Sequence, residues 1–525
     1  MIRRKIIIFL LFTATILHSC TKLEERFRGD LTEEQVGADS ANTSALLAGV
    51  YNSMEFPFTS HITIWPLLEL STDEAIAPTR GTDWDDNGVW RVFHQQKWPS
   101  TNERIRNCFN TLNGISYAAT DMLRYQPKRH EQAEARFIRA WVMYLLLDMF
   151  NQVPYRDPGE SLIEPARVRT GMEAWDYIVE EINAVEPDLP PDNPVWRANK
   201  FAAKVLLMKC YLNKAVYINR ADPNPDAADM DKVISLADAI IKSNAFSFST
   251  NYFDNFAPDN TDIGKENIFT QRNDPYSNPA NALFIAYGMV LHYSQGPSYG
   301  GWGFNGFTTL SDFYDKFEPS DLRRGMPYHV DGAAPNPNNR INVGFLIGQQ
   351  YDLFTNDPLK NFFGIPVIFT PEVKNIELGA NLDVTGIRPL KYFPDFQNFW
   401  GPGNDYVFFR FSDVLLMKAE AILRGGAATS AGVYGSNATE IVNAIRTDPS
   451  RKASRLSSVD LNILLDERAR ELWFEGWRRQ DMIRFGKFLE PFQEKEYKSD
   501  PKYLVFPIPN EQIAFNPNLI QNTGY

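Results

Sequence analysis

Apolar residues recur at three- and four-residue steps along much of the chain, which is the spacing of helices that bury one face. The clearest stripe runs from Arg129 to Phe150 and consists of Ala133, Phe137, Ala140, Trp141, Tyr144 and Leu147. Val153-Pro154 ends this helix because proline cannot continue it. The same spacing predicts further helices over Ala41–Met54, Arg104–Tyr125, Gly171–Val185, Asn199–Tyr217, Asp229–Ser243, Arg410–Leu423 and Asn437–Arg446. The pattern therefore predicts a mostly α protein.

The segment from Ser457 to Gly486 predicts a helical hairpin. A serine N-cap precedes a stripe of Leu461, Leu464, Leu465, Ala469, Leu472 and Trp473. Gly476 is expected to end the first helix, and Met482 and Ile483 belong to a second, shorter one. The remaining residues from Tyr503 to Tyr525 are expected to wrap back across the surface.

Two long stretches show neither a helical nor a strand period. Residues 65–98 interleave four tryptophans with charged side chains and glycines, which favours a system of surface loops. Residues 251–408 are rich in Asn, Gly, Pro and Phe. Irregular regions of this length inside a helical protein are usually functional, and the aromatic content argues against disorder.

The first twenty residues predict an export signal. Arg3, Arg4 and Lys5 precede about twelve apolar residues, whereas a membrane-spanning helix needs about twenty. Leu17-His18-Ser19-Cys20 resembles a bacterial lipobox, whose cysteine is lipidated and anchors the protein to a membrane. The expected organisation is a signal peptide (1–19), a lipidated tether (20–40), a helical scaffold with an aromatic loop insertion at about 65–100 (41–250), a loop-rich ligand-binding subdomain (251–408), and C-terminal helices with the wrapping tail (409–525).

Composition narrows the function classes. A net charge of -12 and the lack of a basic stripe exclude a nucleic-acid binder, because phosphates would be repelled. Hydrophobic residues make up 44% of the chain, which is enough for a large core. Cys108 and Cys210 fall in apolar helical patterns, so we expect two buried free thiols rather than a disulfide.

Catalytic and metal motifs are absent from the sequence. The six histidines are scattered, and there is no HExxH, no GxSxG and no GxxxxGK[ST]. Residues 251–262 (NYFDNFAPDNTD) contain enough oxygen ligands to suggest calcium but lack EF-hand spacing, which favours a solvated loop. No cofactor, metal or catalytic residue is predicted.

Glu467, Glu471 and Glu475 lie on one side of the predicted hairpin helix, since they follow each other at four-residue steps. Paired carboxylates can indicate acid-base catalysis. Neighbouring guanidinium groups keep carboxylates ionised, however, which does not suit a general acid. The arginines of this segment are Arg468, Arg470, Arg478, Arg479 and Arg484. We therefore interpret the glutamates as members of structural ion pairs.

Four stretches, in order along the chain, resemble the SusD/RagB family, the outer-membrane nutrient-binding lipoproteins of Bacteroidetes. They are AEARFIRAWVMYLLLDMFNQVPY (133–155), RFSDVLLMKAEAI (410–422), ERARELWFEGWRRQDMIRFGKF (467–488) and YLVFPIPNEQIAFNPNLIQNTGY (503–525). The resemblance implies a tetratricopeptide-like helical scaffold with a large loop-rich subdomain. It also implies a non-enzymatic lipoprotein of the outer membrane that faces the cell exterior and passes oligosaccharides to a SusC-like TonB-dependent transporter.

Sugar recognition needs flat apolar rings for the C–H faces and planar polar groups for the hydroxyls. The irregular stretches supply both, and the predicted ligand-binding residues are Arg80, Asp83, Trp84, Trp98, Tyr299 and Trp302. Trp90 and Asp85 belong to the same mixture. The alternative interpretation is that these rings fill hydrophobic gaps beneath the loops.

Two other functions stay open at this stage. A RagB-like protein would bind peptides instead of sugars. A surface glycoside hydrolase would use carboxylates such as Asp73, Glu74 or Asp83.

Overall fold

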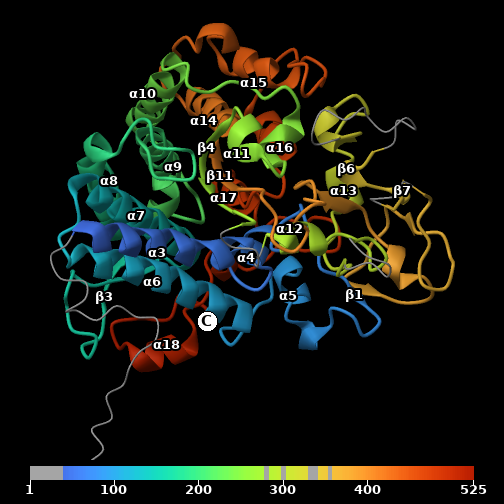
Figure 1. Ribbon diagram of the computed structural model, residues 1–525, viewed down its shortest axis with the longest axis horizontal. Coiled ribbons are helices and arrows are strands. Elements are labelled where there is room, and N and C mark those ends of the chain that lie inside the picture. The colour runs from blue at the N-terminus through green and yellow to red at the C-terminus, as the bar shows by residue number, and fades with distance from the viewer. Residues whose placement is uncertain (1–39, 277–282, 297–302, 329–340, 353–356) are drawn as a thin grey trace, which may run out of the picture.

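The computed structural model describes residues 40–276, 283–296, 303–328, 341–352 and 357–525 (Figure 1). Helices dominate the left and top of the view in Figure 1. The main ones are α3 (Ser40–Thr59), α6 (Glu103–Leu123), α7 (Arg129–Phe150), α8 (Gly171–Val185), α9 (Lys200–Ile218), α10 (Ala227–Lys242), α14 (Phe411–Leu423), α15 (Ala438–Arg446), α16 (Leu461–Leu472) and α17 (Arg478–Arg484). All of the helices predicted from periodicity are present, which confirms the mostly α fold.

Helix starts follow local side-chain chemistry. Asn102, Asn199 and Asp226 accept hydrogen bonds from the first backbone N–H groups of α6, α9 and α10. At the hairpin, the cap is Asp460 rather than the predicted serine. Helix α16 also ends at Leu472, four residues before Gly476, whose φ of +81° lies in the connection to α17.

Successive helices pack side by side and build the scaffold. Helix α7 packs on α6 and α8, α9 on α8 and α10, and α14 on α10, α15 and α16. This stack of helix pairs is the expected tetratricopeptide-like arrangement. Within the described residues no helix has both the length and the apolar character needed to cross a bilayer. Cys108 and Cys210 are free and buried, as predicted.

The irregular stretches contain short elements that periodicity did not predict. The strands form small sheets, β4 (Asn267–Gln271) with β11 (Tyr406–Arg410), β10 (Arg388–Leu390) with β6 (Val343–Leu346) and β5 (Gly325–Met326), β7 (Gly348–Gln349) with β8 (Ile368–Phe369), β1 (Thr79–Arg80) with β9 (Ile376–Glu377), and β2 (Gln152–Tyr155) with β3 (Arg167–Thr170). The short helices are α4 (Ile64–Glu69), α5 (Arg91–His94), α11 (Asn260–Ile263), α12 (Phe284–Gly288), α13 (Ser311–Tyr314) and α18 (Asn510–Phe515). Elements of two to six residues are too short to show a period.

The C-terminal segment returns to the scaffold as expected. Phe506 N donates to Met149 O at 2.8 Å, and Asn522 Nδ2 donates to Phe150 O at 2.9 Å. The segment therefore caps the end of α7. The 251–262 loop is likewise held by the protein itself, since Asn260 Nδ2 donates to Asn255 O and Asp405 O.

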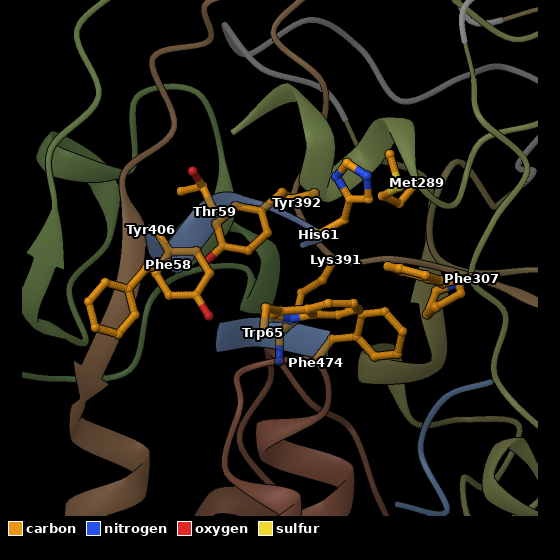
Figure 2. A pocket seen from close by; sticks show the side chains of 12 residues that line it. Phe58, Thr59, His61, Trp65, Met289, Phe307, Lys391, Tyr392, Tyr406 and Phe474 are labelled. Atoms are coloured by element: carbon orange, nitrogen blue, oxygen red, sulfur yellow. The ribbon is translucent and has the colours of Figure 1, made fainter. Parts of the chain in front are cut away.

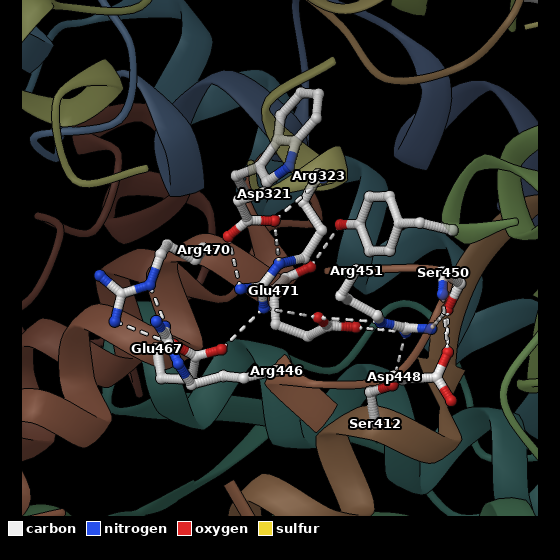
Figure 3. A network of polar contacts seen from close by, with 12 residues as sticks. Asp321, Arg323, Ser412, Arg446, Asp448, Ser450, Arg451, Glu467, Arg470 and Glu471 are labelled. Carbon is white, nitrogen blue, oxygen red and sulfur yellow. Dashed lines mark hydrogen bonds and ion pairs between the residues drawn. The ribbon is translucent and has the colours of Figure 1, made fainter. Parts of the chain in front are cut away.

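The three hairpin glutamates are buried among cations, and Figure 3 shows the network around Glu467 and Glu471. Glu467 accepts from Arg323 and Arg446, and Arg323 also bonds Glu471 at 2.9 Å. Although burial alone would raise it, the surrounding guanidinium groups lower the pKa of Glu467 to about 2. The interpretation as structural ion pairs is confirmed. The difference from the expectation is that most partners come from outside the hairpin, so the charges join the hairpin to other segments.

Two other buried carboxyl groups, those of Glu69 and Glu74, have raised pKa values instead of lowered ones. Glu69 Oε1 accepts from Gly476 N at 2.5 Å, and Glu74 Oε2 accepts from Phe474 N at 3.1 Å. Burial raises the pKa of Glu69 to about 7, and burial together with the neighbouring carboxylate raises the pKa of Glu74 well above its usual value. At neutral pH the pair therefore holds a proton beneath the hairpin connection.

This pair makes stability depend on pH. The native state binds a proton that the unfolded state releases, so the free energy of unfolding should fall as pH rises from about 4.5 to 7 and above, by up to about 3 kcal/mol. Glu74→Gln keeps a hydrogen-bond donor without a titrating proton, and it should reduce this fall. Urea-unfolding midpoints at pH 5.5 and pH 8 test the prediction, with the exposed Glu180→Gln as control. Equal pH dependence in wild type and Glu74→Gln would contradict it.

Candidate functional site

Arg80 and Asp83 stand at a tight turn that follows β1. Arg80 N donates to Asp83 O and Asp83 N donates to Arg80 O, both at 3.0 Å. Gly81 takes a φ of +65° inside this turn, a conformation that favours glycine. The turn exposes Asp83 and buries Arg80, whose exposed fraction is 4%.

Arg80 holds the walls of the site together. Its guanidinium donates to Asn305 O at 2.6 Å, to Gly306 O at 3.0 Å, and to the carbonyl and hydroxyl oxygens of Thr385 at 2.9 and 3.2 Å. Burial lowers the pKa of Arg80 to about 10, so the side chain is still a cation at neutral pH. Four of its N–H groups bond the protein, which gives Arg80 a positioning role, and the predicted ligand contact stays a prediction.

Trp84 lies beside this turn and is partly buried. Its Nε1 donates to Phe304 O at 2.9 Å. A Cβ at Gly306 would stand 2.4 Å from an indole carbon, so the ring lies directly on the glycine. Phe307 and the buried Trp90 pack against it, with ring centroids at 5.3 and 5.6 Å. Trp84 thus packs against the segment that carries Phe304 and Gly306, and it does not line the pocket described below.

Trp98 does not belong to the same surface. Its exposed fraction is 1%, its Nε1 donates to Tyr525 OH at 2.8 Å, and Phe506 packs on it at 4.8 Å. The returning C-terminal segment covers the ring, so the predicted ligand contact is wrong for this residue. Trp98 instead follows the alternative interpretation, a ring that fills a hydrophobic gap. Tyr299, Trp302 and Cys20 lie outside the described residues.

Asp83 opens onto a pocket of about 270 Å³, which we call the Asp83 pocket. Segments far apart in the sequence line it, namely Arg80, Asp83, Tyr293, Asn305, Asn361, Phe363, Ile365, Asn381, Leu382 and Asp383. Sequence reasoning identified the first two. The others lie in the 251–408 stretch. The sequence predicted that this stretch binds ligand, but it did not identify these particular residues.

Polar groups in the Asp83 pocket are held by neutral partners. The Tyr293 hydroxyl donates to the Asp83 carboxylate, and His292 Nε2 contacts Asp383 Oδ2 at 3.0 Å. Ser294 N donates to His292 Nδ1, which places the ring proton on Nε2. Burial lowers the pKa of His292, so the ring is neutral near pH 7.

The pocket also offers an exposed ring and, behind it, a buried amide. Phe363 is 88% exposed at the tip of a turn in which Asn361 Oδ1 accepts from the N–H groups of Phe363 and Ile365 at 3.0 Å. Asn305 is fully buried, and its Nδ2 meets no hydrogen-bond partner among the described residues. Rings, carboxylates and amides in this combination suit a molecule with many hydroxyl groups.

Other cavities do not contain the predicted residues. The enclosed cavity between Trp65, Phe307 and Lys391 measures about 20 Å³, room for a single water and not for a sugar ring (Figure 2). Three open clefts of about 770, 690 and 470 Å³ lie elsewhere, and Trp196 lines the first two. None of them shares a lining residue with the Asp83 pocket.

Of the three carboxylates suggested for hydrolysis, Asp73 and Glu74 have partners away from the Asp83 pocket. Against the effect of burial, the Arg478 guanidinium 2.7 Å from Asp73 lowers the pKa of that carboxyl. Glu74 is buried beside Glu69. Neither residue lines the Asp83 pocket.

A match to a protein-family model shows the family to which this chain is related. A model of the SusD family matches residues 249–525, from the start of the loop-rich region to the last residue. The chain belongs to the SusD family. The resemblance of the four sequence stretches is thereby confirmed, and the helical scaffold and loop-rich region described above are those of a SusD-family protein.

Two relatives and two solved structures illustrate the similarity. The starch-binding protein SusD of Bacteroides thetaiotaomicron is 25% identical, with 87% of this chain and 84% of the relative covered. SusD-like protein P2 of Formosa agariphila is 22% identical over 99% of both chains. A SusD superfamily protein from Parabacteroides distasonis superposes with a TM-score of 0.69 at 20% identity, covering 94% of this chain and 100% of the other. Surface glycan-binding protein A of Bacteroides thetaiotaomicron, in complex with laminarihexaose, gives 0.64 at 16% identity, covering 92% and 99%.

Proposed function

We propose that this SusD-family protein captures oligosaccharides in the Asp83 pocket. The observation that carries the proposal is the pocket itself, where an exposed phenylalanine, two carboxylates and several amides from distant segments surround one concave surface. The helical scaffold and the buried Arg80 fix these segments in place, which lowers the cost of ordering them on binding.

The relatives support a sugar as the cargo. One is named as a starch-binding protein, and one structural neighbour is a glycan-binding protein that holds laminarihexaose. On this proposal the protein binds its ligand without cleaving it and passes it to a SusC-like TonB-dependent transporter. The sequence around Cys20 supports a lipid anchor, which would hold the protein on the outer membrane, facing the cell exterior.

Calorimetry with maltohexaose, laminarihexaose and cellohexaose tests ligand capture. Phe363→Ala removes an exposed ring and should leave folding intact, but it should weaken binding of the captured glycan at least tenfold, or about 1.4 kcal/mol. Trp196→Ala is the matched control, since this partly buried ring lines the two larger clefts instead. Loss of affinity in Trp196→Ala with none in Phe363→Ala would move the site away from the Asp83 pocket.

The same samples separate the alternatives. Release of new reducing ends during incubation with the oligosaccharides would indicate a glycoside hydrolase. Binding of peptides but of no glycan would indicate the RagB-like function.

A further inference from the structure

The two arginines at the Asp83 pocket point their donors into the protein. Arg80 bonds the oxygens of Asn305, Gly306 and Thr385, as described above. Arg388 is fully buried on Phe369, and it donates to Asn305 Oδ1 at 2.7 Å, to Asp383 O at 3.0 Å and to Thr385 O at 2.7 Å. Recognition of a carboxylate or sulfate relies on free guanidinium or ammonium donors. Four of the five N–H groups of Arg80 are used in this way, and Arg388 does not line the pocket.

The carboxylates, by contrast, face the pocket. Asp83 is exposed, and the side chain of Asp383 is 24% exposed. Their closest partners are the Tyr293 hydroxyl and the neutral His292 ring, neither of which cancels a negative charge. The lining therefore presents two accessible anions, whereas the two cations nearby, Arg80 and Arg388, are buried and direct most of their N–H groups at protein oxygens.

Neighbouring residues do not change this balance. Lys360 precedes Asn361 but is exposed and does not line the pocket. The sequence segments 277–282, 297–302 and 353–356 contain no charged residue, and the segment 329–340 contains one aspartate and one arginine. The chain as a whole is acidic, with a net charge of -12. The positive charges that act on the two carboxylates are the guanidinium groups of Arg80 and Arg388, which are buried whereas the carboxylates are accessible.

We infer that the Asp83 pocket selects uncharged saccharides and rejects glycans that carry a carboxylate or sulfate on the bound sugars. The inference rests on the proposed capture of glycans. Sugar hydroxyls donate hydrogen bonds to Asp83 and Asp383. An anionic group in the same place meets like charges at short range, where repulsion is strongest.

A matched pair of ligands tests the inference. The hexasaccharide that binds best among the maltose, laminaribiose and cellobiose series is oxidised at C6, which converts each CH₂OH into a carboxylate without changing the backbone or its linkages. In calorimetry at 20 mM NaCl, the oxidised form should bind at least tenfold more weakly. The difference should shrink at 500 mM NaCl because salt screens exposed charges.

Variants connect the discrimination to the two aspartates. The double variant Asp83→Asn, Asp383→Asn should reduce the difference in affinity between neutral and oxidised ligands. The control is the double variant Asp222→Asn, Asp315→Asn, which changes the net charge equally at remote exposed positions and should leave this difference unchanged. Melting temperatures check that each variant is folded.

The outcomes separate this inference from the proposed function. Oxidised ligand that binds as tightly as the neutral one, or a protein that binds only uronic or sulfated oligosaccharides, would overturn the charge selection and leave glycan capture standing. If no glycan of either series binds, the proposed function fails and the inference fails with it.

Discussion

Glu471→Gln is expected to lower the free energy of unfolding by about 3–5 kcal/mol, the range for breaking a buried ion pair from one side. The Glu471 carboxylate accepts from Arg323 at 2.9 Å, from Arg410 at 2.6 Å and from Arg451 at 2.7 Å. All four side chains are buried. A glutamine has nearly the same shape but leaves this cluster with one uncompensated positive charge.

Urea-unfolding midpoints of wild type and Glu471→Gln measure the effect. Glu180→Gln is the control, because Glu180 is exposed on α8. Its replacement should change the free energy of unfolding by less than about 0.5 kcal/mol, as is usual for surface substitutions. An unchanged midpoint for Glu471→Gln would show that the network adds specificity without net stability.

The same network predicts loss of stability in acid. Arginines hold the pKa of Glu471 well below its usual range despite burial, and the pKa of Glu467 is about 2. The native state therefore binds fewer protons than the unfolded state, and this stabilisation is lost as pH falls from about 4.5 to 2.

Arg80→Met is expected to lower the free energy of unfolding by about 3 kcal/mol and to weaken glycan binding at least tenfold. The change leaves the carbonyl oxygens of Asn305 and Gly306 without their donor, and each unsatisfied buried group costs about 1–3 kcal/mol. Affinity falls because the segments that carry Asn305 and Asp383 are no longer held in register. Both quantities are measured on one preparation, by urea unfolding and by calorimetry.

Arg106→Met is the matched control for Arg80→Met. Arg106 forms an exposed ion pair with Glu511, a contact worth less than about 1 kcal/mol. If Arg80→Met loses affinity but keeps its unfolding midpoint, Arg80 contacts the ligand directly, as the sequence alone suggested. Arg80→Lys distinguishes the roles further, since it keeps the charge but cannot reproduce the branched set of hydrogen bonds.

Helices were predictable from this sequence because their apolar residues follow the helical period, as on α6, α8 and α10, although α7 and α14 are buried on nearly every side. The stripe of α7 gave both of its boundaries, and the four-residue spacing of the hairpin glutamates showed their shared face. The strands were not predictable, since β4 and β11 are buried along their whole length and show no alternation. Their pairing joins residues more than a hundred positions apart.

The candidate site was predictable only in its local part. Arg80 and Asp83 were noticed because charged and aromatic residues crowd one short stretch. Asn305, Phe363 and Asp383 reach the pocket through tertiary contacts that leave no local pattern. Trp98 was predicted to contact ligand but is buried, and this too could not be seen locally. The segment that covers the ring lies some four hundred residues later in the chain.

The ion network also bears on how this protein can be divided. Glu471 binds arginines from residues 323, 410 and 451, and Arg451 bonds Glu266 at a separation of 185 residues. An excised fragment of the loop region would therefore expose charges whose counterions stay on the other piece. Truncation experiments should treat the region from 249 to 525 as a single cooperative unit, rather than separating its loop region from its C-terminal helices.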